Sequence, residues 1–265
     1  MHAYAARFDP ADHAPRVALL LAGVGLDSAA SLAAIGALPA PVALAVSPYA
    51  THLDPVLAAA RADGHEYLMS LPLEPARYPL NDPGPRALLS SQTPAQNLAA
   101  LDWALSRAQG YVGATAALGL TNGERFAGDA EDMTPVLRQL AQRGLLYIDP
   151  RPGAARLPFV WARAVDVVID HPADPASEEA ALTRLDRLAR AHGSALGLVE
   201  AVRPDTITLL TAWAHGLAGR GLVLTPVSAL AFAPPASAQP APAQTTPAQT
   251  AHAPPTPGAT GTAAK

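Results

Sequence analysis

The sequence predicts an α/β fold, a single domain built as a distorted (β/α)7-type barrel of parallel strands, with a disordered C-terminal tail. Three observations predict it. Short apolar runs alternate with helical patterns of about ten or more residues along most of the chain. Half of the 265 residues are apolar, which is enough for a sizeable core. From about Phe232 onward the chain consists mainly of Ala, Pro, Thr and Gln, and this composition cannot form a hydrophobic core.

The strands are expected in apolar runs that are bounded by turn residues. The first run extends from Val17 to Leu21 and ends before Gly23 and Gly25, a pattern typical of a buried strand. Further strands of this kind are expected at 42–46, 66–71, 111–118, 145–148, 165–169, 195–199 and 222–224.

The helices are expected between these runs. Asp27 and Ser28 supply N-cap chemistry for a helix that continues to about Leu38. Further helices are expected at 53–62, 95–108, 133–143, 177–191 and 205–218. Such alternation favours parallel strands with helical crossovers. About seven or eight units suit a closed or nearly closed barrel, and a doubly wound open sheet is the alternative.

The chain divides into three segments by composition. Residues 1–15 form a polar N-terminal lead, residues 16–231 the folded domain, and residues 232–265 the Ala/Pro/Thr/Gln-rich tail. Because the tail buries too little apolar surface to offset its ordering entropy, we expect it to be disordered.

Composition excludes several function classes. The formal net charge is -4 and the arginines are scattered, so no basic patch for nucleic acid is visible. The absence of cysteine excludes disulfides, thiolate metal sites and a Cys nucleophile. No apolar stretch is long and unbroken enough for a transmembrane segment. No signal peptide is visible at the N-terminus, so the localisation is left open.

Several short phrases occur along the chain in a fixed order. They are Pro48-Tyr49-Ala50, Leu71-Pro72-Leu73-Glu74-Pro75, Asp82-Pro83-Gly84-Pro85, Gly123 with Arg125-Phe126, Asp149 with Arg151, and Pro204-Asp205-Thr206. The ordered set resembles the divergent polysaccharide deacetylase family over about residues 16–230. The resemblance implies a distorted seven-stranded barrel and a hydrolase that removes acetyl groups from envelope sugars at a C–N bond. It also implies a divalent metal such as zinc, a polysaccharide ligand, and the bacterial envelope or periplasm.

The chain departs from the family at the positions that the resemblance assigns to the metal site. Ala22 and Gly23 stand where the family has an Asp-Asp pair, and Ser70 and Thr121 stand where it has histidines. Metal-assisted amide hydrolysis needs about three protein ligands and an open position for water. We therefore expect no metal and a protein that is catalytically degenerate.

Loops after the carboxyl ends of the strands carry the remaining site candidates. Carboxylates divide acid and base roles when their environments separate their pKa values, and arginine binds sugar carboxylates or acetyl groups in a forked geometry. Each residue also has a structural alternative: a turn for Glu74, a cap for Asp149, and an ion pair for Arg125. The catalytic candidates are Glu74 and Asp149, and the substrate-binding candidates are Tyr49, Tyr78, Arg125, Phe126, Arg151 and Glu200.

Three hypotheses about function follow. The first is a degenerate deacetylase-like domain that binds a glycan without hydrolysing it. The second is an active deacetylase with a rebuilt site made of Glu74, Asp149 and Glu200, which requires these carboxylates to lie close together. The third is a scaffold for protein interactions that uses the tail as a tether.

Overall fold

The computed structural model describes residues 14–169 and 175–235. Within them, one all-parallel sheet runs in the order β6-β5-β4-β3-β2-β1-β8-β7, and β9 pairs with β1 beside this path. Most of the expected N-terminal lead, and the expected tail beyond residue 235, lie outside the described residues. The strands are β1 (Arg16–Val24), β2 (Ala43–Val46), β3 (Tyr67–Ser70), β4 (Gly113–Thr115), β5 (Leu146–Asp149), β6 (Ala162–Ala164), β7 (Val167–Val168), β8 (Ser194–Val199) and β9 (Val223–Leu224).

The two ends of this sheet are joined by one short stretch of chain. β6 pairs with β5, and β7, which follows after Val165 and Asp166, pairs with β8 on the other side. The Val165 N–H donates to the Asp149 carbonyl of β5, and the Asp166 N–H donates to the Leu196 carbonyl of β8. The chain therefore switches its hydrogen-bonding partner from β5 to β8 between these two residues. The sheet is therefore a curled, distorted barrel. This confirms the barrel that the sequence predicted, and the alternative of a doubly wound open sheet does not hold.

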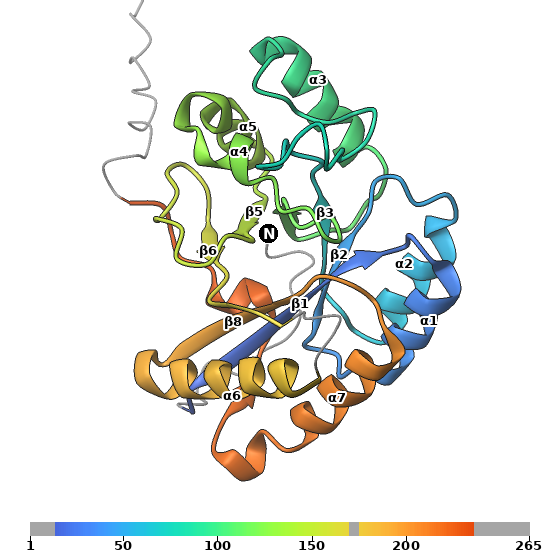
Figure 1. Ribbon diagram of the computed structural model, residues 1–265, viewed down its shortest axis with the longest axis vertical. Helices are drawn as coiled ribbons and strands as arrows, with labels where there is room; N and C mark the ends of the chain where they lie inside the picture. The colour runs from blue at the N-terminus through green and yellow to red at the C-terminus, as the bar shows by residue number, and fades with distance from the viewer. Residues whose placement is uncertain (1–13, 170–174, 236–265) are drawn as a thin grey trace, which may run out of the picture.

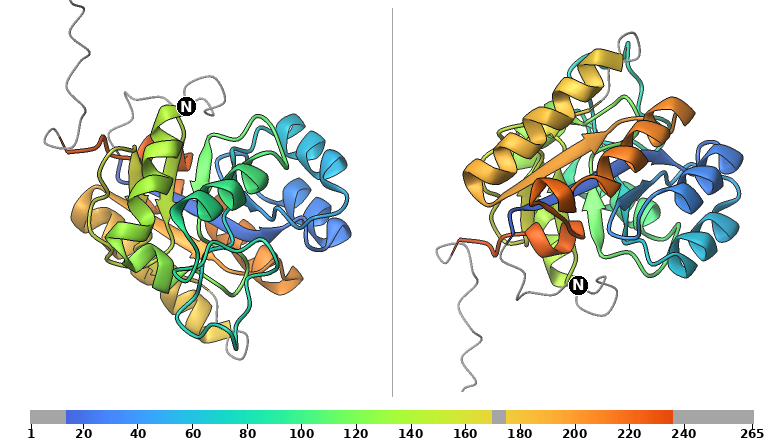
Figure 2. Two further views of the ribbon diagram at one scale, coloured as in Figure 1. Left: turned by 90° about the horizontal axis from the view of Figure 1, so that it is seen from above. Right: turned by 90° about the horizontal axis from the view of Figure 1, so that it is seen from below.

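Helices surround the curled sheet on its outside (Figures 1 and 2). α1 packs against α2 and α7, α6 packs against β8, and α5 packs against α3 and α4. None of the helices in the described part of the chain has the length and hydropathy needed to cross a membrane. The α-helices are α1 (Ser28–Ala37), α2 (Leu53–Ala62), α3 (Pro94–Leu105), α4 (Glu124–Gly128), α5 (Ala130–Gln142), α6 (Pro175–His192) and α7 (Pro204–His215); η1 (Ala218–Arg220) and η2 (Val227–Leu230) are 3-10 turns.

Caps explain where several helices begin. The Asp27 side chain accepts the Ala30 N–H at the start of α1, as the sequence predicted. Thr93 and Gln96 form a reciprocal capping box at the start of α3, with Pro94 at the first helical position. The short helix α4 was not expected, and it begins after Gly123, whose backbone is left-handed with φ 62°.

The core has two layers, because successive strand residues point to opposite faces of the sheet. Leu19, Leu21 and Tyr147 belong to the outer layer, which lies between the sheet and the helices. Leu20 and Ile148 belong to the inner layer, which includes no residue of α1–α7 and fills the barrel. Alternation thus fixes the face of each strand-end residue, and that face decides which polar side chains meet.

Candidate functional site

Two loops, which follow β4 and β8, approach the end of β1. Ala22 is fully buried, and Gly23 is left-handed, with φ 75°. A Cβ atom placed on Gly23 would lie 3.6 Å from the Glu200 carbonyl oxygen and 3.9 Å from the Gly119 Cα. A residue with a side chain at position 23 would therefore be strained by the left-handed backbone, whereas its Cβ atom would make only ordinary van der Waals contacts.

Polar side chains lie at the end of β3 and on the loops after β4 and β8. Leu68 faces the barrel interior, so alternation also turns Ser70 inward, where its Oγ is buried with no hydrogen-bond partner among the described residues. The Thr121 hydroxyl donates to the Leu118 carbonyl at 3.1 Å. Asn122 Nδ2 donates to Glu200 Oε1 at 2.6 Å and so ties the loop after β4 to the loop after β8.

Glu74 binds the chain around it. Its side chain is almost fully buried, and Oε2 accepts the Ser90 N–H at 2.7 Å and the Ser90 hydroxyl at 2.6 Å. Arg125 Nε lies 3.2 Å from Glu74 Oε1, but the Arg125 side chain is 57% exposed. Glu74 therefore fastens the two ends of the long loop after β3 to each other and reaches α4 through Arg125.

Asp149 forms a closed pair with Arg151. Ile148 faces the barrel interior, so Asp149 faces outward with Tyr147, toward the helices. Its carboxylate accepts the Arg151 N–H at 3.0 Å, Nε at 2.9 Å and Nη2 at 2.7 Å. The hydrogen bonds that Arg151 donates to Asp149 raise the pKa of the Arg151 guanidinium. Burial, followed by the charge of Asp149, raises the pKa of Tyr147 well above its usual value.

The three aromatic candidates lie in different settings. Tyr49 is half-buried, its ring centroid is 5.3 Å from that of Trp103, and its hydroxyl accepts the Arg86 N–H at 3.2 Å. Burial raises the pKa of Tyr49. Tyr78 is half-buried on the loop after β3. Phe126 is fully buried in the outer core, so it offers no face to a sugar, contrary to the stacking role that the sequence suggested.

The candidate residues therefore form separate pairs. Glu74 pairs with Arg125, Asp149 with Arg151 and Glu200 with Asn122. Ser90 and Asn122 were not singled out from the sequence, because they become partners only through contacts between distant segments.

Residues 19–231 match the family model described as divergent polysaccharide deacetylase. The chain belongs to this family. No curated protein matches this member of the family.

Three solved structures resemble this divergent polysaccharide deacetylase. An uncharacterized protein from Agrobacterium tumefaciens C58 has 31% identity and a TM-score of 0.78, with 86% of this chain and 94% of that chain covered. A family 4 carbohydrate esterase from Streptomyces lividans, solved with acetate, has 16% identity and a TM-score of 0.51, with 84% and 99% covered. The catalytic domain of a peptidoglycan N-acetylglucosamine deacetylase from Eubacterium rectale ATCC 33656 has 13% identity and a TM-score of 0.52, with 85% and 93% covered. The last two show the shared fold.

The divalent metal implied by the family does not fit the residues at these positions. Ala22 and Gly23 carry no donor side chain, and Ser70 and Thr121 offer neutral hydroxyls, which are poor zinc ligands. Within residues 14–169 and 175–235, no three His, Asp or Glu side chains come together as a possible metal site. His171 lies outside the described residues. We derive no catalytic step through a metal.

Proposed function

We propose that this divergent polysaccharide deacetylase is a catalytically degenerate member of its family that binds an envelope glycan without removing its acetyl groups. The observation that carries the proposal is the end of β1, where Ala22 and Gly23 replace carboxylates and the Glu200 carbonyl and Gly119 lie close to Gly23. A metal-bound water needs protein ligands that hold the metal, and Ala22 and Gly23 carry no donor side chain.

A rebuilt carboxylate site is less well supported. Acid and base roles need two carboxylates on either side of one substrate bond, at separations of roughly 5–10 Å in known glycan hydrolases. Asp149 faces the helices and is held in three hydrogen bonds by Arg151, whereas Glu200 follows the inner face of β8. Glu74 is engaged by Ser90 and Arg125 on another loop. The three carboxylates are engaged by different partners, which does not support a shared acid and base role.

The glycan-binding part of the proposal rests on the loop after β3 and on α4. Arg125 is 57% exposed and keeps part of its guanidinium free of Glu74, which it contacts through Nε. The two segments are joined, because the Ala76 N–H donates to Glu124 Oε2 and the Phe126 N–H donates to the Glu74 carbonyl. Tyr78 lies two residues beyond Ala76. An aromatic ring and an arginine on neighbouring segments suit a sugar ring and its acyl or carboxyl group.

A scaffold for protein interactions is the second candidate. It is favoured by three exposed leucines on the loops after β1, β3 and β4: Leu26, Leu80 and Leu120 are 60%, 73% and 71% exposed. Apolar side chains exposed on loops are frequent at interfaces, although single ones are also common on ordinary surfaces.

Acetate release and glycan retention test the proposal together. The full chain is incubated with N-acetylated glucosamine oligomers and with peptidoglycan fragments, with added zinc or cobalt, and acetate is measured. We expect no release above the protein-free sample, but retention of the protein on insoluble peptidoglycan. Metal-dependent release that a chelator stops would contradict the degenerate site.

Matched variants separate glycan binding from general adhesion. Arg125→Gln and Tyr78→Ala are expected to reduce retention by about tenfold, which corresponds to one lost charge-assisted or stacking contact. Arg184→Gln makes the same charge change at an exposed position of α6 and is expected to leave retention unchanged. Equal retention of all variants, or none for the unaltered protein, would favour the scaffold instead.

A further inference from the structure

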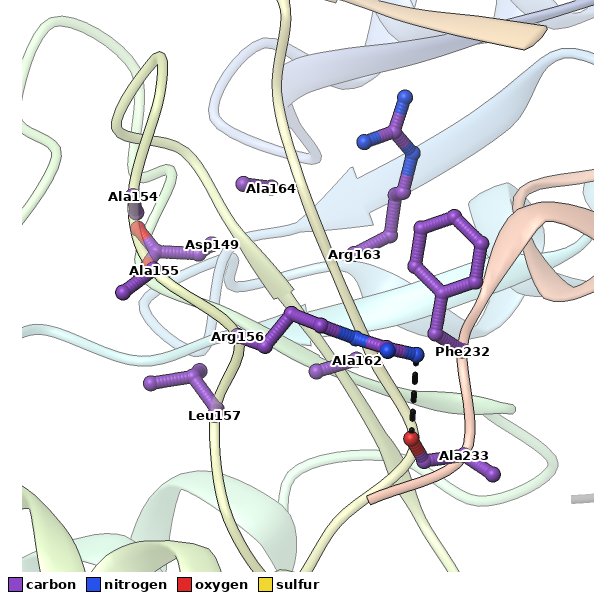
Figure 3. A pocket seen from close by; sticks show the side chains of 10 residues that line it. All are labelled: Asp149, Ala154, Ala155, Arg156, Leu157, Ala162, Arg163, Ala164, Phe232 and Ala233. Carbon is purple, nitrogen blue, oxygen red and sulfur yellow. Dashed lines mark hydrogen bonds between the residues drawn. The ribbon is translucent and has the colours of Figure 1, made fainter. Parts of the chain in front are cut away.

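A small pocket lies beside β6 and includes no residue of β1 in its lining (Figure 3). It is bounded by the loop after β5, by β6, and by the segment that follows η2. Phe232 closes one side, because its N–H and carbonyl exchange hydrogen bonds with Ala162 in an antiparallel bridge. The folded part therefore includes Phe232, which the sequence had assigned to the tail.

The walls of this pocket are mainly apolar and its rim is cationic. Five alanines, Leu157 and the Phe232 ring supply apolar surface. Arg156 and Arg163 both approach the Phe232 ring, with guanidinium carbons 4.9 Å and 5.4 Å from its centroid. The five alanines are Ala154, Ala155, Ala162, Ala164 and Ala233.

Most charges at the pocket are already balanced. Asp149 is held by Arg151, and Arg163 Nη2 lies 2.5 Å from Asp166 Oδ2. Arg156 has no carboxylate partner among the described residues, and its one hydrogen bond, to the Ala233 carbonyl, is long at 3.5 Å. The rim thus has one positive charge without a counter-charge, on an exposed side chain held by a weak contact.

The size of the pocket limits what fits. Its volume is about 60 Å³. A water-sized group needs roughly 10–15 Å³ by this measure, so there is room for about four to six non-hydrogen atoms. A ligand of this size that matches apolar walls and one guanidinium has a short aliphatic part and a single carboxylate.

We propose that this pocket binds a short-chain monocarboxylate of about four to six non-hydrogen atoms, with the carboxylate on Arg156 and the aliphatic part against the alanines and Phe232. The acid is either a free metabolite or a short acidic substituent of a sugar, since both present the same group. This inference does not rest on the proposed function, because a free acid binds here whether or not the protein binds glycan.

Isothermal titration and NMR line shifts with the full chain test the site. Propionate is the first probe, and propionamide and propylamine are its neutral and cationic counterparts. We expect saturable binding of propionate in the millimolar range, and binding of the two counterparts weaker by about tenfold or more. A lactic acid ether of a sugar, compared with free lactate, distinguishes the two sources, because tighter binding of the sugar ether identifies a glycan substituent.

Variants make the result specific to the pocket. Arg156→Gln is expected to weaken propionate binding by about tenfold or more, and Ala154→Leu to abolish it by filling the cavity. Arg184→Gln serves as the charge-matched control and is expected to bind propionate like the unaltered protein. Circular dichroism confirms that each variant is folded. Absence of saturable propionate binding by the unaltered chain, or equal binding by folded Arg156→Gln, would overturn the proposal.

Discussion

Replacement of Glu74 by alanine tests whether this buried carboxylate supports the fold or acts on a substrate. Glu74 is 4% exposed and accepts two hydrogen bonds from Ser90, at 2.7 Å and 2.6 Å. Its contact with Arg125 is much more open to solvent, because the Arg125 side chain is 57% exposed. The two contacts therefore contribute unequally to the free energy of unfolding.

The magnitude follows from these contacts. A hydrogen bond to a charged group contributes roughly 1.5–3 kcal/mol, so loss of both bonds from Ser90 costs about 3–6 kcal/mol. An exposed ion pair contributes about 0–1 kcal/mol, so Arg125→Ala costs no more than about 1 kcal/mol. Domains of this size are stable by about 5–15 kcal/mol, and the Glu74→Ala protein remains folded at low temperature.

Urea unfolding at pH 7 measures these differences. Glu74→Ala, Ser90→Ala and the double variant form one thermodynamic cycle, and Arg125→Ala provides the second comparison. We expect a coupling of about 1.5–3 kcal/mol between Glu74 and Ser90, and at most about 1 kcal/mol between Glu74 and Arg125. A decrease of less than about 1 kcal/mol in the free energy of unfolding of Glu74→Ala would refute the structural role and make Glu74 a catalytic candidate again.

Two further substitutions test the barrel itself. The Tyr147 hydroxyl is buried with no hydrogen-bond partner in the described chain, so Tyr147→Phe is expected to raise stability by about 1 kcal/mol in urea unfolding. Burial raises the pKa of folded Tyr147. In the unfolded chain Tyr147 ionises at about pH 10, so the stability that its raised pKa contributes is complete below that pH and is lost as the pH rises further. Tyr147→Phe removes this ionisation, so we expect the free energy of unfolding of the variant to fall less steeply at alkaline pH. The same fall in the free energy of unfolding with alkaline pH in both proteins would contradict this role of Tyr147. A Cβ atom on Gly113 would lie 2.3 Å from the Leu146 carbonyl oxygen, so Gly113→Ala is expected to cost about 2–4 kcal/mol by separating β4 from β5. Gly36→Ala, which meets open space in α1, is expected to gain about 0.5–1 kcal/mol, and equal midpoints for both glycine variants would refute the clash.

The alternation of elements was readable from the sequence because it depends on local periodicity. The apolar run from Val17 to Leu21 became the central part of β1, and Asp27 caps α1 as expected. β6 and α4 were missed for physical reasons. The Ala-Arg-Ala segment of β6 is only partly buried, and α4 has five residues, too few to show a helical period.

The site was less predictable because its contacts join distant parts of the chain. The Asp149–Arg151 pair lies within one loop and was among the alternatives weighed from the sequence. Asn122 and Glu200 are 78 residues apart, and their hydrogen bond depends on the closure of the barrel. The burial of Phe126 likewise follows from the packing of α4 and not from any local pattern.

The central claim is that the positions assigned to the family's metal centre no longer hold a metal. Elemental analysis of the full chain, purified without chelator and dialysed against trace zinc, tests it most directly, because it includes the residues outside the described ranges. Ala22, Gly23, Ser70 and Thr121 offer no set of about three good zinc ligands, so we expect well under one ion per chain. One tightly held ion per chain, retained through dialysis, would contradict the account and identify this protein as a metalloenzyme with a rebuilt site.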